Sequence, residues 1–376
     1  MSTQPVSRFD AVFDPTSLGG LRLPNRIVMA PMTRRQSPGG VPDREVARYY
    51  ARRAEGGAGL IITEGTYVDH PVAGGFFNVP HCFGREALDG WRRVVDGVHD
   101  AGSLIAAQLW HLGNVRQRAV APRPELPSIG PARIVTDGVV ETEAMTTAEA
   151  GELAASFARA AHDALEAGFD AVEVHGAHGY LLDQFLWARM NTRDDAYGGS
   201  FERRLRLSLD VVEAVRRAVG PQVPVIFRFS QWKVQDYGAR VVESSAELRI
   251  MLDVLGAAGV DIFDVSTRRF WEPAFADEGD ADLATLVREI SGKPVIMVGS
   301  IGVDNAFSAA QVRGSEDLTV GIVNLERAVA HLETGRADCL ALGRALLADP
   351  DWPAKVRAGE FERIVPYRKD MFSSLA

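Results

Sequence analysis

Two histidines and a tyrosine lie close together in the segment FDAVEVHGAHGYLLDQFL (169–186). His175, His178 and Tyr180 directly follow the apolar run 171–174, and a helical pattern begins immediately after them. At the end of a strand, two imidazoles and a phenol offer two hydrogen-bond donors and one proton source. Such groups can polarise a substrate carbonyl and deliver a proton next to it. Each residue alone fits a satisfied loop or packing role, but the three together favour a catalytic site.

The elements that position these residues follow from the alternation of apolar runs and amphipathic segments. Near-continuous apolar strands separated by helices indicate a parallel sheet covered on its faces. Glycines such as Gly168 and Gly259 close helices just before the next strand, as C-terminal caps do. The pattern predicts an α/β fold, a closed (β/α)8 TIM barrel formed by residues 1–376 as a single domain. The expected strands are 27–32, 60–64, 104–109, 171–175, 223–229, 261–266, 294–298 and 338–342.

The helices are expected between these strands, at 45–56, 87–101, 147–167, 201–219, 244–258, 282–291 and 324–334. Turn signals at Asp14-Pro15 and Gly19-Gly20 predict that residues 10–26 form a hairpin capping the bottom of the barrel. The Pro- and Gly-rich stretches 68–86 and 112–146 are expected to be long loops at the catalytic face. Residues 314–323 are expected to form an insertion before the last βα unit.

Composition excludes several classes of function. The chain has 376 residues, of which 46% are hydrophobic, and this is enough for a large core. A net charge of −9 argues against nucleic acid or an anionic membrane surface as the main partner. The N-terminus lacks the apolar stretch of a signal peptide, and Cys82 and Cys339 cannot form a disulfide framework or a Cys-based zinc site. We therefore expect a soluble cytoplasmic enzyme for a small molecule, with a homodimer left open.

Two glycines at the ends of the last strands point to a phosphate. Gly299-Ser300 and Gly343-Arg344 end the seventh and eighth expected strands, where many barrels bind a phosphate through backbone N–H groups. Either glycine alone would fit a tight turn. Polar residues at the other strand ends extend around the same mouth. Together they predict a phosphate-bearing cofactor lying across the barrel.

These segments resemble the old yellow enzyme family, FMN-dependent NAD(P)H:flavin oxidoreductases that reduce activated alkenes. The resemblance runs from Phe13 almost to the C-terminus. Its most specific part is His-x-x-His-x-Tyr-Leu-Leu-x-Gln-Phe followed by Tyr-Gly-Gly-Ser. The matching segments are VMAPMTR (28–34), LIITEGT (60–66), AAQLWHLG (106–113), residues 169–186, YGGSFERRLRL (197–207), RFS (228–230), VGSIG (298–302) and LALGRALLADPDW (340–352).

The resemblance implies FMN as cofactor and NADPH or NADH as hydride donor. It places Thr33 at the flavin C4 carbonyl and Gln108 at the pyrimidine edge. Arg228 would stand near N1 and O2, where the reduced ring carries negative charge. Gly65 would let the backbone approach the ring. The remaining implied FMN-binding residues are Pro31, Met32, Gly299, Ser300, Gly343 and Arg344, the last four at the phosphate.

The resemblance also assigns the substrate side. His175 and His178 would bind the carbonyl oxygen of an α,β-unsaturated compound, and Tyr180 would protonate its α-carbon after hydride from flavin N5 reaches the β-carbon. Trp110 and one of Phe76 or Phe77 would form the wall of the substrate site, with Trp271 or Phe270 above it. The implied activity is ene-reduction; reduction of nitro compounds or nitrate esters is the alternative.

Three other interpretations have less support. A barrel metallohydrolase with His111, His175 and His178 as ligands lacks an H-x-H at the first strand end and has Arg228 where a metal needs a carboxylate. A non-catalytic flavin carrier would need no proton donor such as Tyr180. A doubly wound nucleotide-binding fold would require a full glycine fingerprint, which the sequence after Gly57-Ala58-Gly59 lacks.

Overall fold

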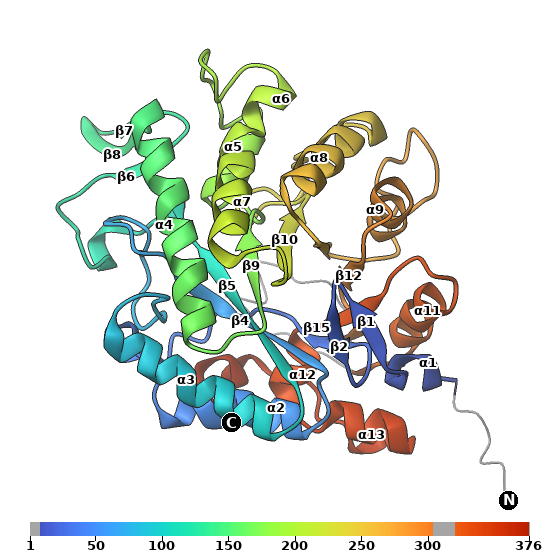
Figure 1. The fold of residues 1–376 in the computed structure, drawn as a ribbon. Coiled ribbons are helices and arrows are strands. Elements are labelled where there is room, and N and C mark those ends of the chain that lie inside the picture. Colours follow the sequence, from blue (N-terminus) through green and yellow to red (C-terminus); the bar gives the residue numbers. More distant parts are fainter. Residues whose placement is uncertain (1–7, 304–319, 376) are drawn as a thin grey trace, which may run out of the picture.

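The computed structural model describes residues 8–303 and 320–375 (Figure 1). Parallel strands form a closed barrel in which β15 pairs with β3 and so joins the two ends of the sheet. The predicted TIM barrel is confirmed. Its strands are β3 (Ile27–Met29), β4 (Leu60–Tyr67), β5 (Leu104–Trp110), β9 (Ala171–His175), β10 (Val225–Ser230), β11 (Ile262–Ser266), β12 (Val295–Val298) and β15 (Cys339–Leu342).

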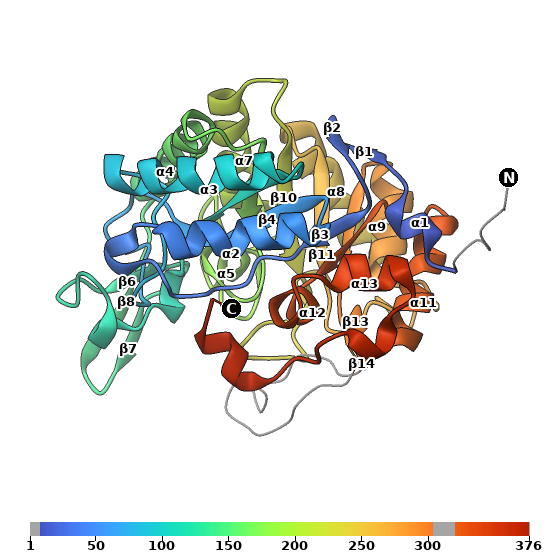
Figure 2. The same cartoon turned by 90° about the horizontal axis from the view of Figure 1, so that it is seen from below.

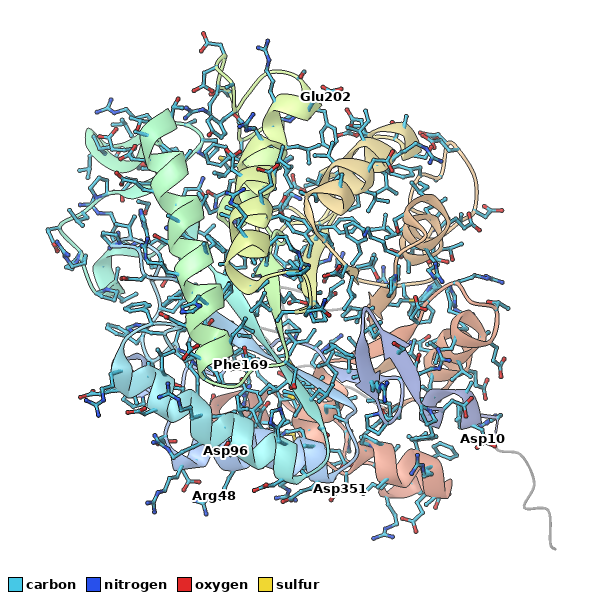
Figure 3. The ribbon with its side chains drawn as sticks, viewed as in Figure 1. Asp10, Arg48, Asp96, Phe169, Glu202 and Asp351 are labelled. Carbon is cyan, nitrogen blue, oxygen red and sulfur yellow. The ribbon has the colours of Figure 1, made fainter. Side chains whose placement is uncertain are left out.

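Helices surround the barrel and present charged side chains such as Arg48 and Asp96 to the outside (Figure 3). Their starts follow from local capping: Thr146 and Glu149 form a capping box, and Asp43 accepts from two backbone N–H groups of the first turn that follows it. The main helices are α2 (Arg44–Glu55), α3 (Arg85–Asp100), α4 (Thr147–Glu166), α7 (Arg206–Val219), α8 (Ser245–Ala258), α9 (Leu283–Ser291) and α11 (Ile322–Glu333), followed by α12 (Arg344–Ala348) and α13 (Trp352–Ala358). Each predicted helix is present with small shifts at its ends, except that the helix predicted at 201–219 is divided at Leu205 into a short helix and α7.

A hairpin closes the N-terminal mouth of the barrel, as expected. A short helix, α1 (Asp10–Phe13), precedes the antiparallel strands β1 (Thr16–Leu18) and β2 (Leu21–Leu23). Gly19 has φ +57°, and a Cβ there would stand 2.7 Å from Ile262 Cγ1, so the turn touches the interior of the barrel. The leucines of the hairpin pack in one cluster with barrel residues that include Val28, Leu60, Ala106, Ala171, Ile226, Ile262, Ile296 and Cys339.

The barrel interior changes character along the strands. Alternate residues of a strand face the same side. The inward side chains become polar two residues after the apolar cluster members Ala106, Ala171, Ile226 and Ile262. These polar side chains belong to residues that are at most 4% exposed. We call this set the polar layer: Gln108, Glu173, Arg228 and Asp264. The next step along the same strands reaches Trp110, His175, Ser230 and Ser266, at the C-terminal ends.

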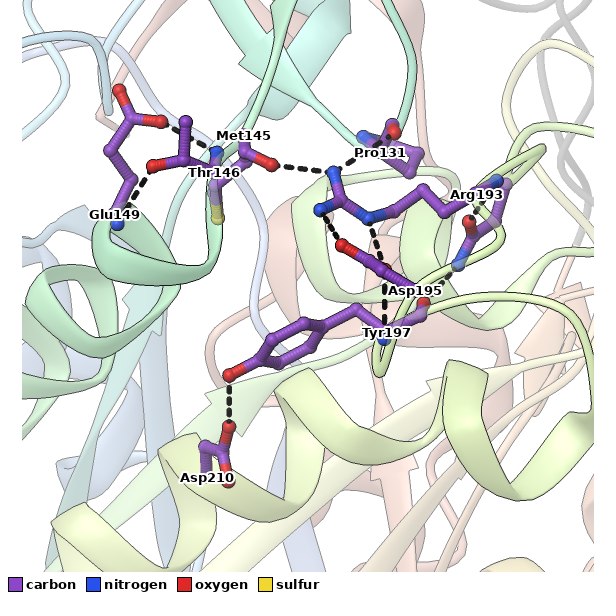
Figure 4. A network of polar contacts seen from close by, with 9 residues as sticks. Pro131, Met145, Thr146, Glu149, Arg193, Asp195, Tyr197 and Asp210 are labelled. Carbon is purple, nitrogen blue, oxygen red and sulfur yellow. Dashed lines mark hydrogen bonds and ion pairs between the residues drawn. The ribbon is translucent and has the colours of Figure 1, made fainter.

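The stretch 112–146, predicted as a loop, instead contains a small sheet. Strands β6 (Ser128–Gly130), β8 (Val139–Ala144) and β7 (Ile134–Thr136) pair in that order and lie to one side of the barrel (Figure 2). Arg193 connects this sheet to the segment after β9, because its guanidinium pairs with Asp195 and donates to the carbonyl oxygens of Pro131 and Met145 (Figure 4).

Two short helices, α5 (Leu181–Leu186) and α6 (Phe201–Arg204), lie between β9 and α7. The predicted insertion at 314–323 lies mostly outside the described residues; of it, only β14 (Val320–Gly321), which pairs with β13 (Gly302–Val303), and the start of α11 are described. Within the described part of the chain, every helix is too short or too polar to cross a bilayer.

Candidate active site

The structure brings His175, His178 and Tyr180 together at the end of β9. The ring of His175 lies 5.3 Å from that of His178 and 5.2 Å from that of Tyr180, centroid to centroid. His178 has φ +65°, an uncommon conformation for a residue with a side chain. Its backbone N–H donates to Ser230 Oγ at 2.9 Å, and its Nε2 hydrogen-bonds Ser266 Oγ at 2.8 Å. The ends of β10 and β11 thus hold the strained residue in place.

A buried ion pair also anchors the loop that follows β9. Asp183 of α5 contacts Lys233 Nζ at 2.7 Å, and both side chains are fully buried. Asp183 also accepts from the backbone N–H of Gly179 at 2.7 Å. A parallel bridge between His178 and Lys233 connects the loops after β9 and β10. Sequence reasoning missed Lys233, because its pairing with Asp183 depends on how the loops after β9 and β10 pack together.

Electrostatics give the three residues defined protonation states. Burial lowers the pKa of His175 well below its usual range, and the charge of Arg228 lowers it further. Burial and the same arginine also lower the pKa of His178. Both imidazoles are therefore neutral at pH 7, and each retains one N–H. Burial raises the pKa of Tyr180 to about 12, so the phenol keeps its proton.

Aromatic rings surround these groups. Trp110, the last residue of β5, packs edge-on against Tyr180 with centroids 4.8 Å apart, and Phe76 lies 6.1 Å from Trp110. Phe77 is 63% exposed, so Phe76 is the member of the predicted pair that packs at the site. A Cβ on Gly65 would lie 2.4 Å from Trp110 Cε3, so only glycine leaves room for this indole.

The ring packed against His178 is Trp232, which sequence reasoning did not single out. Their centroids are 4.4 Å apart. The contacts of Trp271 are instead with Phe270 and the guanidinium of Arg327 in α11. They give no support to its predicted place above the substrate, which stays a prediction. The signal for Trp232 was its position two residues after the strand-end Ser230.

Arg228 lies in the polar layer with a partner that the sequence did not disclose. Its Nη1 donates to Asp264 Oδ2 at 2.8 Å and its Nη2 to Ser266 Oγ at 3.3 Å. Gln108 Nε2 donates to Glu173 Oε1 at 2.7 Å. Arg228 Nε and His175 Nδ1 are buried without a hydrogen-bond partner among the described residues. These atoms could donate to or accept from a ligand. Together with the guanidinium of Arg228, the amide of Gln108 and the nearby aromatic rings, they suit a flat polar ring such as the isoalloxazine of FMN.

The predicted phosphate residues end neighbouring strands, because β12 pairs with β15 and β15 with β3. Gly299 has φ +155°, and a Cβ there would lie 2.3 Å from Thr267 Oγ1. Ser300 donates its hydroxyl to the Arg268 carbonyl at 2.8 Å. Arg344 begins α12, and burial lowers its pKa to about 10, which leaves the side chain charged at pH 7.

The end of β3 completes this side of the barrel mouth. The strand ends at Met29, shorter than predicted, so the half-buried Pro31, Met32 and Thr33 lie in the loop that follows. A Cβ on Gly343 would lie 3.4 Å from Met32 Sδ, which places this loop against the end of β15. The predicted cofactor residues therefore surround one mouth of the barrel.

His111 is engaged elsewhere. Its Nδ1 accepts from the backbone N–H of Gly113 at 3.0 Å, so its Nε2 carries the proton donated to His70 Nδ1, 3.1 Å away. Across residues 8–303 and 320–375, no group of three or more His, Cys, Asp or Glu side chains could hold a metal ion.

Comparisons with known proteins identify relatives. A family model described as NADH:flavin oxidoreductase / NADH oxidase matches residues 11–362. NADH oxidase of Thermoanaerobacter brockii is 32% identical over 369 residues, which cover 96% of this chain and 52% of that protein. The chain thus spans about half the length of such curated relatives.

Two solved structures have the same fold. Morphinone reductase in complex with tetrahydroNAD is 31% identical with a TM-score of 0.78, covering 96% of this chain and 94% of the other. An old yellow enzyme homologue from Zymomonas mobilis is 26% identical with a TM-score of 0.79, covering 97% and 96%.

Proposed function

Because this chain belongs to the NADH:flavin oxidoreductase / NADH oxidase family, that of the old yellow enzymes, we propose that it is an ene-reductase. In this proposal the whole chain acts as one FMN-binding domain. It takes electrons from NADH or NADPH and reduces the C=C bond of α,β-unsaturated carbonyl compounds. The observation that carries the proposal is the grouping of two neutral histidines and a protonated tyrosine at one buried strand end.

FMN is the cofactor of this family, and when bound it supplies the hydride that it has accepted from the nicotinamide. In the proposal, Thr33, Gln108 and Arg228 bind its ring, with Pro31, Met32 and Gly65 alongside. Ser300 and Arg344 bind its phosphate next to Gly299 and Gly343. The charged Arg344 suits this task because a guanidinium matches the geometry of phosphate oxygens.

His175 and His178 act on the substrate oxygen. Each neutral imidazole can donate one hydrogen bond. In His178 the donor is Nδ1, with Nε2 accepting from Ser266 Oγ. The two ring centroids lie 5.3 Å apart, so both rings can donate to one carbonyl oxygen. Donation withdraws electron density from the conjugated C=C bond and stabilises the negative charge that develops on that oxygen. Because the histidines are neutral, they do not protonate the oxygen outright.

Tyr180 supplies the proton. Its pKa of about 12, set by burial, keeps the phenol protonated until a basic carbon forms beside it. The phenol then donates to the α-carbon and is reprotonated from solvent. Trp110 packs against Tyr180, Phe76 against Trp110, and Trp232 against His178. In the proposal these rings limit the access of water that could protonate the carbon in place of Tyr180.

The direct test uses the colour of the holoprotein. The purified protein should be yellow, bleach anaerobically with NADH or NADPH, and recover its colour when cyclohexenone is added. Recovery with oxygen but with none of a panel of enones, nitroalkenes and nitrate esters would replace the proposal with an NADH oxidase function.

A phenolate ligand tests the two histidines, since its oxygen resembles a polarised carbonyl. His175→Ala and His178→Ala should each weaken phenolate binding while FMN content stays unchanged. His99→Ala is the matched control, because that ring lies on the outer surface against Asp170. Unchanged phenolate affinity in both site variants would remove these histidines from the substrate site.

A further inference from the structure

The polar layer holds two carboxyl groups and one cation. Glu173 and Asp264 are completely buried, and Arg228 is 4% exposed. They lie on the adjacent strands β9, β11 and β10, in which Arg228 is in register with Asp264. His175, the other titratable group above them, is neutral because burial lowers its pKa. Two ionised carboxylates would therefore leave one buried negative charge without a cation.

The hydrogen bonds show which oxygens lack a donor. Asp264 Oδ2 accepts from Arg228, and Glu173 Oε1 accepts from Gln108. The second oxygens, Glu173 Oε2 and Asp264 Oδ1, are buried and have no donor among the described residues. The two carboxyl groups lie within hydrogen-bonding reach of each other. One proton between them gives both remaining oxygens a partner.

We propose that Glu173 is protonated and donates a hydrogen bond to the ionised Asp264. This acid pair positions Arg228, and the negative charge of Asp264 partly offsets the positive charge that Arg228 presents to the cofactor. The inference rests on the proposed function, in which Arg228 binds FMN. It assigns positioning roles to two residues that do not touch the substrate.

The contacts decide which carboxyl carries the proton. Asp264 lies directly against the guanidinium of Arg228, which favours its ionised form. Among the described residues, the hydrogen-bond donor to Glu173 is the neutral amide of Gln108, and the charge of Arg228 affects its pKa less than the charge of Asp264 does. Burial raises the pKa of both groups, and the negative charge of Asp264 raises that of Glu173 further.

This arrangement makes the polar layer neutral overall. Arg228 and Asp264 cancel, and a protonated Glu173 adds no charge. An arginine without a partner would stabilise the negative charge of reduced FMN more strongly than one paired with a carboxylate. Asp264 therefore moderates the preference of the site for the reduced cofactor, and Glu173 keeps Asp264 in place.

Paired substitutions test this charge count. Glu173→Gln copies the neutral acid, so the ratio of FMN affinities, reduced over oxidised, should stay within about twofold of wild type. The double variant Glu173→Gln/Asp264→Asn leaves Arg228 unpaired. It should raise that ratio about tenfold or more, which is about 30 mV in midpoint potential for a two-electron couple. The single variant Asp264→Asn is less informative, because Glu173 could then ionise and replace the lost charge.

The midpoint potential is measured anaerobically against a reference dye. If Glu173→Gln alone raises the ratio as much as the double variant, Glu173 is ionised in the wild type and the proposal is wrong. The proposal is equally wrong if the double variant binds both forms of FMN as the wild type does.

A second measurement needs no cofactor. The infrared band of a protonated carboxyl should be present in the flavin-free wild type and absent in Glu173→Gln. It is recorded well above pH 7, where Glu64, whose pKa burial raises to about 7, is ionised. No difference between the two spectra would overturn the shared proton. A wild type that binds no FMN but shows this band would instead contradict the proposed function and leave the acid pair standing.

Discussion

The two ends of the barrel interior are built from opposite kinds of side chain. At the N-terminal end, aliphatic residues and the leucines of the β1–β2 hairpin pack together in one buried cluster. One step further along the same strands, the interior contains charges and amides. Buried polar atoms that have no hydrogen-bond partner among the described residues are found there, including His175 Nδ1, Arg228 Nε and Trp110 Nε1.

Unpartnered buried polar atoms cost free energy, so a fold retains them in one place only for a reason. The difference between the ends therefore separates two tasks. The apolar end stabilises the barrel, whereas the polar end contains residues that we propose bind the cofactor. Substitutions in the two regions should accordingly have different effects.

The largest effect is expected for Tyr180→Phe at the polar end. The change keeps the ring against Trp110 but removes the proton of the phenol. Reoxidation by cyclohexenone should slow by about 10²–10⁴-fold, the usual contribution of a general acid. Reduction of the flavin by NADH should keep its wild-type rate, since that step needs no proton from this residue. Stopped-flow absorbance measures both half-reactions separately.

A nitroalkene is the matched substrate for this variant. Its reduction product before protonation is a stable anion that can leave and be protonated by water, so its reduction should suffer less. Unchanged enone turnover would show that Tyr180 is not the proton donor. Collapse of both half-reactions would indicate a structural role for the ring.

Ile226→Ala should show the reverse pattern. Ile226 is completely buried in the apolar end, two residues before Arg228. Truncation leaves a cavity, and the free energy of unfolding should fall by roughly 2–5 kcal/mol. The affinity of the folded protein for FMN should not change. Urea unfolding of the flavin-free protein and FMN titration measure the two quantities. A variant that has wild-type stability but no longer binds FMN would contradict the assignment of stability to one end of the barrel and of cofactor binding to the other.

Arg228→Ala tests the polar layer directly. Loss of a charge-assisted hydrogen bond should weaken FMN binding by roughly 1.5–3 kcal/mol. The binding of reduced FMN should be weakened more than the binding of oxidised FMN. The exposed Arg203→Ala serves as control. Titration of the flavin-free protein in both redox states gives the affinities. Equal affinities in variant and wild type would move Arg228 away from the cofactor.

A smaller effect should appear in the dependence of stability on pH. The folded-state pKa values of His175 and His178 are lowered by burial, so the unfolded chain takes up protons first as the pH falls below about 6.5. The contribution of these two histidines to the free energy of unfolding should therefore decrease as the pH falls through this window. Glu64, whose pKa burial raises to about 7, contributes in the opposite direction, so the histidine contribution is read from a comparison with variants. The slope should reach at most about 1.4 kcal/mol per pH unit for each histidine.

Urea unfolding at several pH values from about 5 to 7 measures this slope. His178→Asn should make it shallower, whereas Ile226→Ala should lower the whole curve without changing the slope. An equal slope in His178→Asn and wild type would mean that this histidine is not held neutral by the fold.

The sequence predicted the barrel because each element has its own periodicity and end signals. Helices such as α4 begin at a capping box, and the hairpin turns at Gly19-Gly20, so each can be located without its neighbours. The small sheet of β6, β7 and β8 was missed because its strands are short and lie in a Pro- and Gly-rich stretch. Propensity alone does not distinguish such strands from loop.

The partners of the site residues could not be predicted for a different reason. Glu173 and Asp264 interrupt apolar runs, which suggested nothing beyond a strand. That Asp264 meets Arg228 depends on the register of β10 with β11, and that Trp232 covers His178 depends on the bridge between His178 and Lys233. The register between two strands depends on how the whole barrel packs, so it could not be predicted from the sequence of either strand alone.

The seam between β15 and β3 has a consequence for how the chain is made. There, Arg26 Nη1 donates to the Asp338 carbonyl across 312 residues of sequence. Closing so long a loop costs only about 1 kcal/mol more than closing one a third as long, so equilibrium hardly penalises it. During synthesis the effect is larger. β3 leaves the ribosome first among the barrel strands, yet one of its edges stays unpaired until β15 has emerged. An open strand edge invites pairing with other chains, so we expect the nascent chain to be most prone to aggregation before β15 is available to pair with β3.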